Sequence, residues 1–195
     1  MEVVGDSTQG RRAFVRQLAW RDWWFHLLLA QPTLPYRAIR HQYDRIGWRT
    51  DPNGFDAWCS GRTGFPFVDA GMRQLNATGR MHNRLRMITA SFLVKDLLID
   101  WRLGERYFRR QLIDADLAQN VGNWQWVAGT GPDAAPYFRI FNPTAQAQKF
   151  DPQGEYIRRW VPELAALGGA SIHQPSSLGP LELAAYKLAL TQSAK

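Results

Sequence analysis

The segment from residue 83 to residue 102 is the strongest constraint on the fold of this 195-residue chain. Its apolar residues recur at intervals of three and four, which places them on one side of a helix. They are Leu85, Ile88, Phe92, Leu93, Leu97 and Trp101. Gly104 follows as the expected helix end. The spacing therefore predicts one long amphipathic helix from about Asn83 to Arg102.

Similar spacing, separated by Gly and Pro, predicts further helices along the chain. The longer ones cover residues 13–30, 68–77, 105–113, 117–126, 155–166 and 181–190, and shorter ones lie within 37–50, 55–60 and 145–150. Sustained strand-type alternation does not occur, so we expect an all-α fold. We divide the chain into a polar lead (1–12), a helical domain (13–167), and a linker with a C-terminal helix (168–195), because residues 168–180 are rich in Gly, Ser and Pro.

The charge balance restricts the partners and the compartment. Lysine and arginine number 24 against 17 acids, a net charge of +7, which suits a polyanion such as DNA but could also serve solubility alone. The single cysteine, Cys59, excludes an internal disulfide and suits a reducing cytosol. The longest apolar run, from Trp23 to Ala30, is shorter than the roughly 20 residues of a membrane span. We expect a cytoplasmic monomer without a membrane segment or a signal peptide.

A basic cluster opens the predicted long helix. Arg80, His82, Arg84 and Arg86 lie within seven residues, and a helix N-terminus adds free amides and the positive end of the helix dipole. This arrangement predicts an anion site, although a solvated basic surface is the more ordinary interpretation of such a cluster. Asn83 adds both a hydrogen-bond donor and an acceptor, as the reading of a base edge requires.

Two carboxylates, Asp114 and Asp116, precede the helix predicted at residues 117–126. Either could cap that helix, and either could instead bind Arg86 or accept hydrogen bonds from sugar hydroxyls. A metal site is not expected, because four histidines and one cysteine lack the usual ligand spacing. The motifs typical of α/β-hydrolases, P-loop enzymes and dinucleotide-binding Rossmann domains are also absent from the sequence.

Trp48, Trp101 and Trp124 stand on three separate predicted helical pieces. A compact domain could bring their rings close enough to pass an electron, although core packing is the commoner role of such residues. Trp20 adjoins Arg21, a pairing that suits the stacking of nucleic-acid bases.

Three long stretches, residues 63–75, 79–107 and 114–150, carry a resemblance to a known family. From about Phe14 to Leu164 the chain is similar to the FAD-binding domain of class I DNA photolyases, in the photolyase/cryptochrome family. These enzymes use blue light and reduced FAD to split cyclobutane pyrimidine dimers in DNA. The resemblance implies the C-terminal portion of that helical domain, with FAD as the cofactor and dimer-containing DNA as the partner.

The resemblance also implies roles for individual residues around the flavin. Cofactor contacts are implied for Phe14, Arg86, Asp114, Ala115, Asp116 and Asn120. Within this set Arg86 would pair with Asp114, residues 114–116 would contact the ribityl and adenosine side, and Asn120 would face the isoalloxazine N5. Trp124, Trp101 and Trp48, in that order outward, match the photoreduction relay of the family.

Substrate contacts are implied for Gln17, Trp20, Arg21, Asn83, Arg84, Met87 and Trp126. Trp20 and Trp126 match the two walls that clamp a flipped dimer. Gln17 stands where dimer-repair enzymes usually carry a glutamate, so we expect weaker repair. Glutamine there also occurs in six-four photolyases and cryptochromes, but Asn83 and Met87 replace the histidines of the six-four enzymes and favour the dimer-repair class.

Family members begin with an α/β antenna domain and a helical region whose Thr/Ser-rich loop grips the flavin diphosphate, and nothing before Phe14 resembles either. We therefore expect a truncated chain with lowered FAD affinity and no antenna chromophore, to which an upstream segment or chain could be a partner. Two alternatives stay open: a cryptochrome-like photoreceptor without repair, and an inactive remnant that binds DNA.

Overall fold

The computed structural model describes residues 7–132 and 140–177. Its α-helices are α1 (Ser7–Ala30), α2 (Pro52–Ser60), α3 (Pro66–Thr78), α4 (Asn83–Ser91), α5 (Trp101–Gln111), α6 (Leu117–Ala128), α7 (Pro143–Phe150) and α8 (Glu155–Trp160). A π-helical turn spans Phe92–Asp96, and 3-10 turns span His41–Arg45, Pro162–Leu164, Gly169–Ile172 and Pro175–Ser177. Within these ranges the only strand-like pairing is an isolated bridge between Arg49 and Ile99, so the all-α prediction is confirmed.

Local side chains explain where several helices begin and end. Each N-cap side chain of α2, α5, α6 and α7 accepts a hydrogen bond from a backbone N–H of the first turn, and proline opens α2, α3 and α7. Gly61, Gly79 and Gly129 end α2, α3 and α6 in the left-handed conformation. Gly79 thus ends α3 within two residues of the end predicted at residue 77.

The single helix that we expected from Asn83 to Arg102 is wrong. α4 ends at Ser91, the π-helical turn follows, and Leu98 adopts a left-handed φ of 56°. Asp100 then caps a new helix by accepting from the N–H of Arg102 at 2.9 Å. The apolar period misled the prediction because residues on both sides of this break are buried in the same core.

Gly104, which we expected to end a helix, lies inside α5. A Cβ at this position would overlap the indole of Trp124 and the side chain of Leu93. The glycine therefore serves close packing of α6 on α5, and the helices that we predicted before and after it are one helix from Trp101 onward.

Other predicted boundaries also change. α1 begins at Ser7, so part of the predicted polar lead is helical. The helix expected over residues 155–166 divides at Val161, because Pro162 follows and cannot continue the backbone ladder. The short helix expected within residues 37–50 is a 3-10 turn.

The predicted linker begins at residue 168, but Ile172 and His173 are buried, and Ile172 contacts the backbone at Gly154. The part of this segment up to Ser177 therefore packs on the helices and is not a free linker. The helix expected at residues 181–190 lies outside the described residues. The division of the chain into domains stays a prediction.

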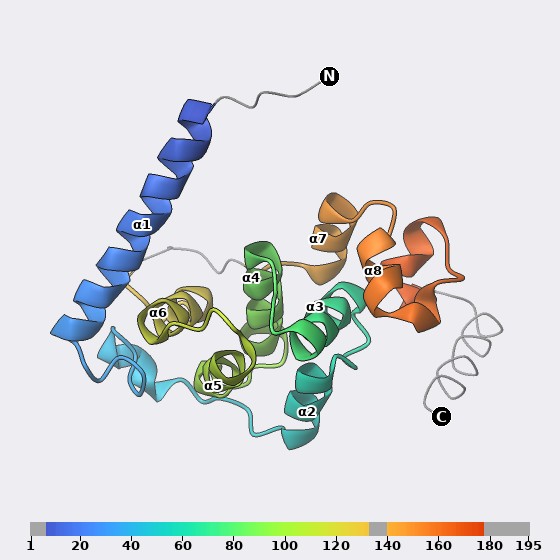
Figure 1. The fold of residues 1–195 in the computed structure, drawn as a ribbon. Coiled ribbons are helices and arrows are strands. Elements are labelled where there is room, and N and C mark those ends of the chain that lie inside the picture. Colours follow the sequence, from blue (N-terminus) through green and yellow to red (C-terminus); the bar gives the residue numbers. More distant parts are fainter. Residues whose placement is uncertain (1–6, 133–139, 178–195) are drawn as a thin grey trace.

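α4 stands in the middle of the molecule, with α5 and α6 on one side and α3, α7 and α8 on the other (Figure 1). α1 packs along α6, and its N-terminal half extends beyond the other helices (Figure 1). Phe14 and Leu18 are consequently exposed. No helix within the described ranges is both long enough and apolar enough to cross a membrane.

The contact between α1 and α6 depends on Gly122. Trp24, 5% exposed, lies on the α6 backbone there, and a Cβ on Gly122 would overlap its ring. We predict that Gly122→Ala lowers the free energy of unfolding by about 1–3 kcal/mol, because the ring must move. Urea denaturation measures this change.

Gly10→Ala on the same helix pair is the matched control. Nothing lies within 4 Å of a Cβ at Gly10, so alanine there should be neutral or should stabilise α1 by up to about 1 kcal/mol. Equal stability of Gly122→Ala and the parent protein would contradict the seating of Trp24 on α6.

Candidate functional site

A cavity of about 530 Å³ opens between α1, α4, α6 and the end of α5. Its lining includes most of the residues that the sequence predicted for the cofactor and the substrate. These are Gln17, Trp20, Asn83, Arg86, Met87, Asp114, Ala115, Asp116, Asn120 and Trp126. Trp124 of the predicted electron relay lines the same cavity. One cavity thus brings together residues from three separate stretches of the chain, 17–24, 83–90 and 108–127.

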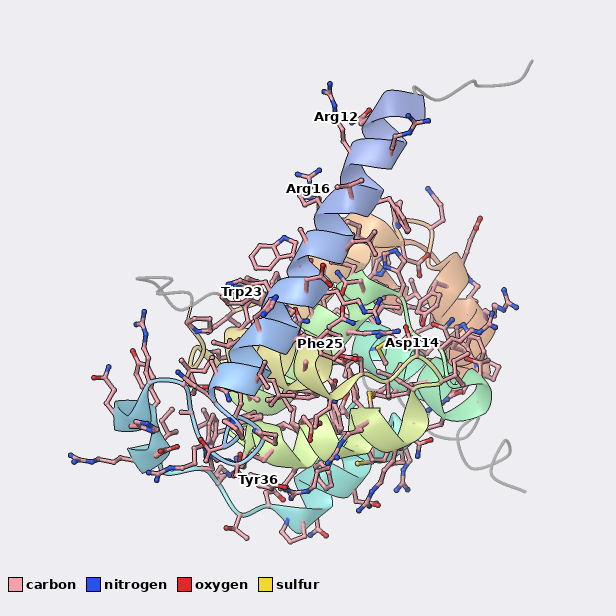
Figure 2. All side chains as sticks on the ribbon, turned by 60° about the vertical axis from the view of Figure 1, so that its left-hand side comes forward. Arg12, Arg16, Trp23, Phe25, Tyr36 and Asp114 are labelled. Atoms are coloured by element: carbon pink, nitrogen blue, oxygen red, sulfur yellow. The ribbon has the colours of Figure 1, made fainter. Side chains whose placement is uncertain are left out.

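An ion pair fixes one part of the wall. Arg86 Nη2 lies 2.9 Å from both carboxylate oxygens of Asp114, and Arg86 Nε donates to the backbone oxygen of Met81 at 2.8 Å. The expected pairing of Arg86 with Asp114 is present, and it ties α4 to the loop before α6. The Asp114 side chain is exposed, and in the view of Figure 2 it lies behind the C-terminal half of α1, in the same part of the molecule as Phe25.

Asp116 has the capping role that the sequence left open. Its Oδ1 accepts from the N–H of Gln119 at 2.9 Å, and its backbone oxygen accepts from the N–H of Asn120. The two carboxylates therefore differ in function: Asp114 holds an arginine, whereas Asp116 starts the helix that carries Asn120 and Trp124 into the cavity.

The side chain of Asn120 has a fixed orientation. Its Nδ2 donates to the backbone oxygen and to Oε1 of Glu105, both at 3.0 Å. The amide oxygen is left as the remaining hydrogen-bonding atom of this cavity residue. Glu105 is only 2% exposed and also meets Arg109 Nε at 3.1 Å. Burial raises the pKa of the Glu105 carboxyl, while Arg109 and Asn120 oppose that rise.

The three tryptophans of the predicted relay are held near the same helix. Trp124 lines the cavity and packs on α5 at Gly104, one turn after Trp101. Trp48 is partly buried, and its segment is tied to the start of α5 by a hydrogen bond of 2.8 Å from the Arg49 N–H to the Leu98 oxygen. Trp101 and Trp48 do not line the cavity.

Trp20 and Trp126 also border a second cavity, of about 470 Å³, on the neighbouring side of α1. Its other described lining residues are Arg16, Ala19, Trp23, Trp24 and Pro132. Arg12, Arg16 and Trp23 project from one side of α1 (Figure 2). The two predicted clamp residues thus stand between the two hollows.

Phe14, Arg21 and Arg84 are absent from the described lining of both cavities. Phe14 lies one turn before Gln17, where α1 has left the other helices. The guanidinium of Arg21 lies 5.5 Å from the ring centre of Phe25, and that of Arg84 lies 5.0 Å from the ring of Phe150. Their predicted contacts to cofactor or DNA stay predictions.

Sequence reasoning missed several lining residues. Trp24, Ala90, Phe108, Leu112, Gln119, Asn123 and Val127 complete the wall. Trp24 could have been found, because it follows Trp20 by four residues and therefore shares its helix face. Glu105 carried no such signal, since its burial depends on the packing of α6 over α5.

Residues 14–193 match the family described as the FAD binding domain of DNA photolyase. The deoxyribodipyrimidine photo-lyase of Escherichia coli K12 is 60% identical over 163 residues, and that of Vibrio cholerae is 55% identical over 173 residues. These alignments cover 83% and 88% of this chain but only 34% and 37% of those proteins, so the chain spans about a third of their length.

Solved structures agree with the sequence relatives. A class III photolyase from Agrobacterium tumefaciens superposes with a TM-score of 0.83 at 47% identity, covering 93% of this chain and 42% of that one. A cryptochrome from Synechocystis gives 0.85 at 41% identity, covering 95% and 38%. The fold is that of the helical domain shared by photolyases and cryptochromes. The chain belongs to the family of photolyase FAD-binding domains.

The buried Glu105 generates a pH prediction. Its folded pKa lies above the ordinary value of 4.5, so its favourable contribution to folding is present below that value and is lost as the pH rises through the folded pKa. Glu105→Gln keeps the acceptor for Asn120 but removes the titration. We predict that the free energy of unfolding of the parent falls relative to that of Glu105→Gln as the pH rises through the folded pKa of Glu105.

Urea denaturation between about pH 4 and pH 8 measures this difference. Glu155→Gln, at an exposed position, controls for the change in net charge. A difference for Glu105→Gln that does not vary with pH would show that burial does not perturb this carboxyl.

Proposed function

We propose that this chain forms the flavin-facing and lesion-facing walls of a deoxyribodipyrimidine photolyase, which uses FAD and blue light to split pyrimidine dimers in DNA. The observation that carries the proposal is the shared cavity of about 530 Å³. It joins the Arg86–Asp114 pair, Asn120 and Trp124 to the residues expected to meet a lesion. Family membership supports the cofactor, and the names of the relatives support the reaction.

The lining fits the ring and the hydroxylated part of FAD. The volume lies within the range of about 300–1,000 Å³ that is usual for ligand sites. Trp124, Phe108 and Leu112 offer apolar surface for a flat ring, and Asp114 and Asp116 offer acceptors for hydroxyls. Arg86 is the one cation in the described lining and is already paired, so these residues fit the flavin diphosphate less well. When bound, FAD would supply light-driven one-electron chemistry.

The chain's own residues would orient and stabilise the cofactor. Glu105 holds the Nδ2 of Asn120, which leaves the amide oxygen to accept a hydrogen bond from a ligand N–H. Because Glu105 is buried, water does not compete for its hydrogen bond to Asn120, and the amide keeps this orientation. We assign Trp124, Trp101 and Trp48 to an electron relay that leads outward from the cavity, on the support of the packing of Trp124 one turn from Trp101.

The lesion would enter between the two aromatic walls, Trp20 and Trp126. Trp20 is 52% exposed and Trp126 is partly buried, so both present ring surface to a flipped base. Photolyases belong to the enzymes that take their target base out of the stack. Arg21 follows Trp20 and Arg84 follows Asn83 in the sequence. The net charge of +7 favours binding to the phosphate backbone of DNA. We also propose a cytoplasmic location, because the single thiol, Cys59, suits a reducing compartment.

A photoreceptor without repair activity is the second candidate. It is favoured by Gln17, which lines the cavity where a repair enzyme would gain from a carboxylate, and by the similarity to a cryptochrome. Asn83, Met87 and the two aromatic walls favour repair, since a photoreceptor has no need of them.

Light-dependent repair separates these candidates. The chain is incubated with FAD and reductant, then with a duplex that contains a thymine dimer, in blue light and in the dark. Dimers should disappear only in the light. Bound flavin without repair would indicate a photoreceptor, whereas DNA binding without flavin would indicate an inactive remnant.

We predict that Trp20→Ala weakens binding of the dimer-containing duplex by about 1–3 kcal/mol, because one stacking surface is lost. Binding of the undamaged duplex should change much less. Trp23→Ala, on the same helix but outside the larger cavity, is the matched control. Equal losses for both duplexes would contradict a clamp role for Trp20.

We also predict that Gln17→Glu raises the repair yield per absorbed photon. A carboxylate at this position in the cavity would stabilise the protonated or hydrogen-bonded lesion radical better than an amide does. The yield is measured on flavin-loaded protein, so that flavin content does not enter the comparison. An unchanged or lower yield would refute the role assigned to position 17.

A further inference from the structure

An unbroken path of ring contacts leads away from Trp124 in a direction that the proposed relay does not use. The ring centre of Trp124 lies 6.1 Å from that of Trp58, and the ring centre of Trp58 lies 5.6 Å from that of Tyr107. The ring of Phe108 contacts both indoles, with its centre 5.1 Å from that of Trp124 and 5.8 Å from that of Trp58. Rings in contact at this spacing exchange electrons readily, because tunnelling falls off steeply only across gaps.

Trp58 is held rigidly at the centre of this path. It is fully buried in α2, and its indole N–H donates to the backbone oxygen of Thr89 on α4 at 2.9 Å. Trp101 of the predicted relay is buried to the same degree, at 1% exposed, so burial does not favour one of these two indoles over the other. Both are therefore comparable as transient carriers of an electron hole.

Tyr107 ends the path at the surface. Its hydroxyl has two acceptors, the backbone oxygen of Cys59 at 3.0 Å and Asn76 Oδ1 at 2.6 Å, and the nearer one belongs to an exposed side chain. A phenol becomes strongly acidic when it loses an electron, so a short hydrogen bond with solvent beyond it gives the proton a way out. Trp58, by contrast, has no such exit, because its N–H faces a buried carbonyl.

Fixed charges add a smaller effect in the same direction. The guanidinium of Arg102 lies 5.0 Å from the ring centre of Trp101, and a cation there disfavours a hole on that ring. Burial chiefly raises the pKa of Tyr107, and the negative charge of the Asp56 carboxylate adds to that rise. Both charges are partly compensated, by Asp100 and by Arg62, so the ring geometry carries the argument.

We propose that Trp124, Trp58 and Tyr107 form a second electron-transfer branch that ends in a tyrosyl radical. A photoexcited one-electron oxidant in the cavity removes one electron from Trp124. Trp124 is refilled from Trp58, and Trp58 from Tyr107, which releases its phenolic proton to Asn76 and water. A soluble thiol later returns one electron and one proton. Flavin as the natural oxidant rests on the proposed function, but the branch itself requires only an oxidant beside Trp124.

The test replaces the flavin with an attached oxidant. Cys59→Ser removes the single native thiol, and Asn123→Cys places a new one on the cavity wall next to Trp124, where a ruthenium polypyridyl label is attached. Flash oxidation with a soluble quencher is followed by freeze-quench electron paramagnetic resonance. The labelled parent should give a tyrosyl radical, which Tyr107→Phe and Trp58→Phe should each reduce to background.

Tyr156→Phe is the matched control. The Tyr156 hydroxyl also donates to an amide oxygen at 2.6 Å, that of Gln74, but its ring contacts Phe67 instead of an indole. The tyrosyl radical should survive Tyr156→Phe, and it should survive Trp101→Phe, which interrupts the other relay.

Persistence of the radical in Tyr107→Phe, or in Trp58→Phe with a native circular dichroism spectrum, would overturn the proposal. A tryptophan radical alone in the labelled parent would overturn it as well. If Trp58→Phe fails to fold, Tyr107→Phe still decides, since it removes only a hydroxyl. A protein that fails to take up FAD would refute the proposed function but not this branch.

Discussion

Two indoles seated on two glycines hold the cavity together. Trp24 of α1 lies on α6 at Gly122, and Trp124 of α6 lies on α5 at Gly104, where any side chain would overlap the ring. The first contact positions α1, and with it Gln17 and Trp20, over the cavity. The second places Trp124 in the cavity wall, with its ring on α5 at a position one helical turn after Trp101. Close packing of this kind tolerates little change of volume, so the site depends on both glycines.

Charge within the site is distributed by backbone geometry. Asp116 caps α6, whereas Asp114 holds Arg86 and so links α4 to the loop before α6, across 28 positions of the sequence. Behind this wall the buried Glu105 fixes Asn120 and is itself held by Arg109. The donors and acceptors that face the cavity are therefore positioned before any ligand arrives, and preorganisation of this kind lowers the cost of binding.

Sequence periodicity and motif resemblance predicted the helical class, the Arg86–Asp114 contact and most of the cavity lining. They did not predict the break at Leu98 and Asp100, because the apolar period continues across it while the backbone does not. The burial of Glu105 was also out of reach, since it arises from α6 packing over α5. The Trp58–Tyr107 contact joins α2 to α5 across 49 positions, and no local pattern records such a distant pairing.

Absorption of the purified chain in the visible range, after incubation with excess FAD and removal of the unbound cofactor, tests the central claim most directly. We expect flavin bands that remain with the protein, that bleach under blue light with reductant, and that diminish in Arg86→Ala. The exposed Arg62→Ala should leave them unchanged. A colourless protein at saturating FAD would contradict the assignment of this cavity to the flavin.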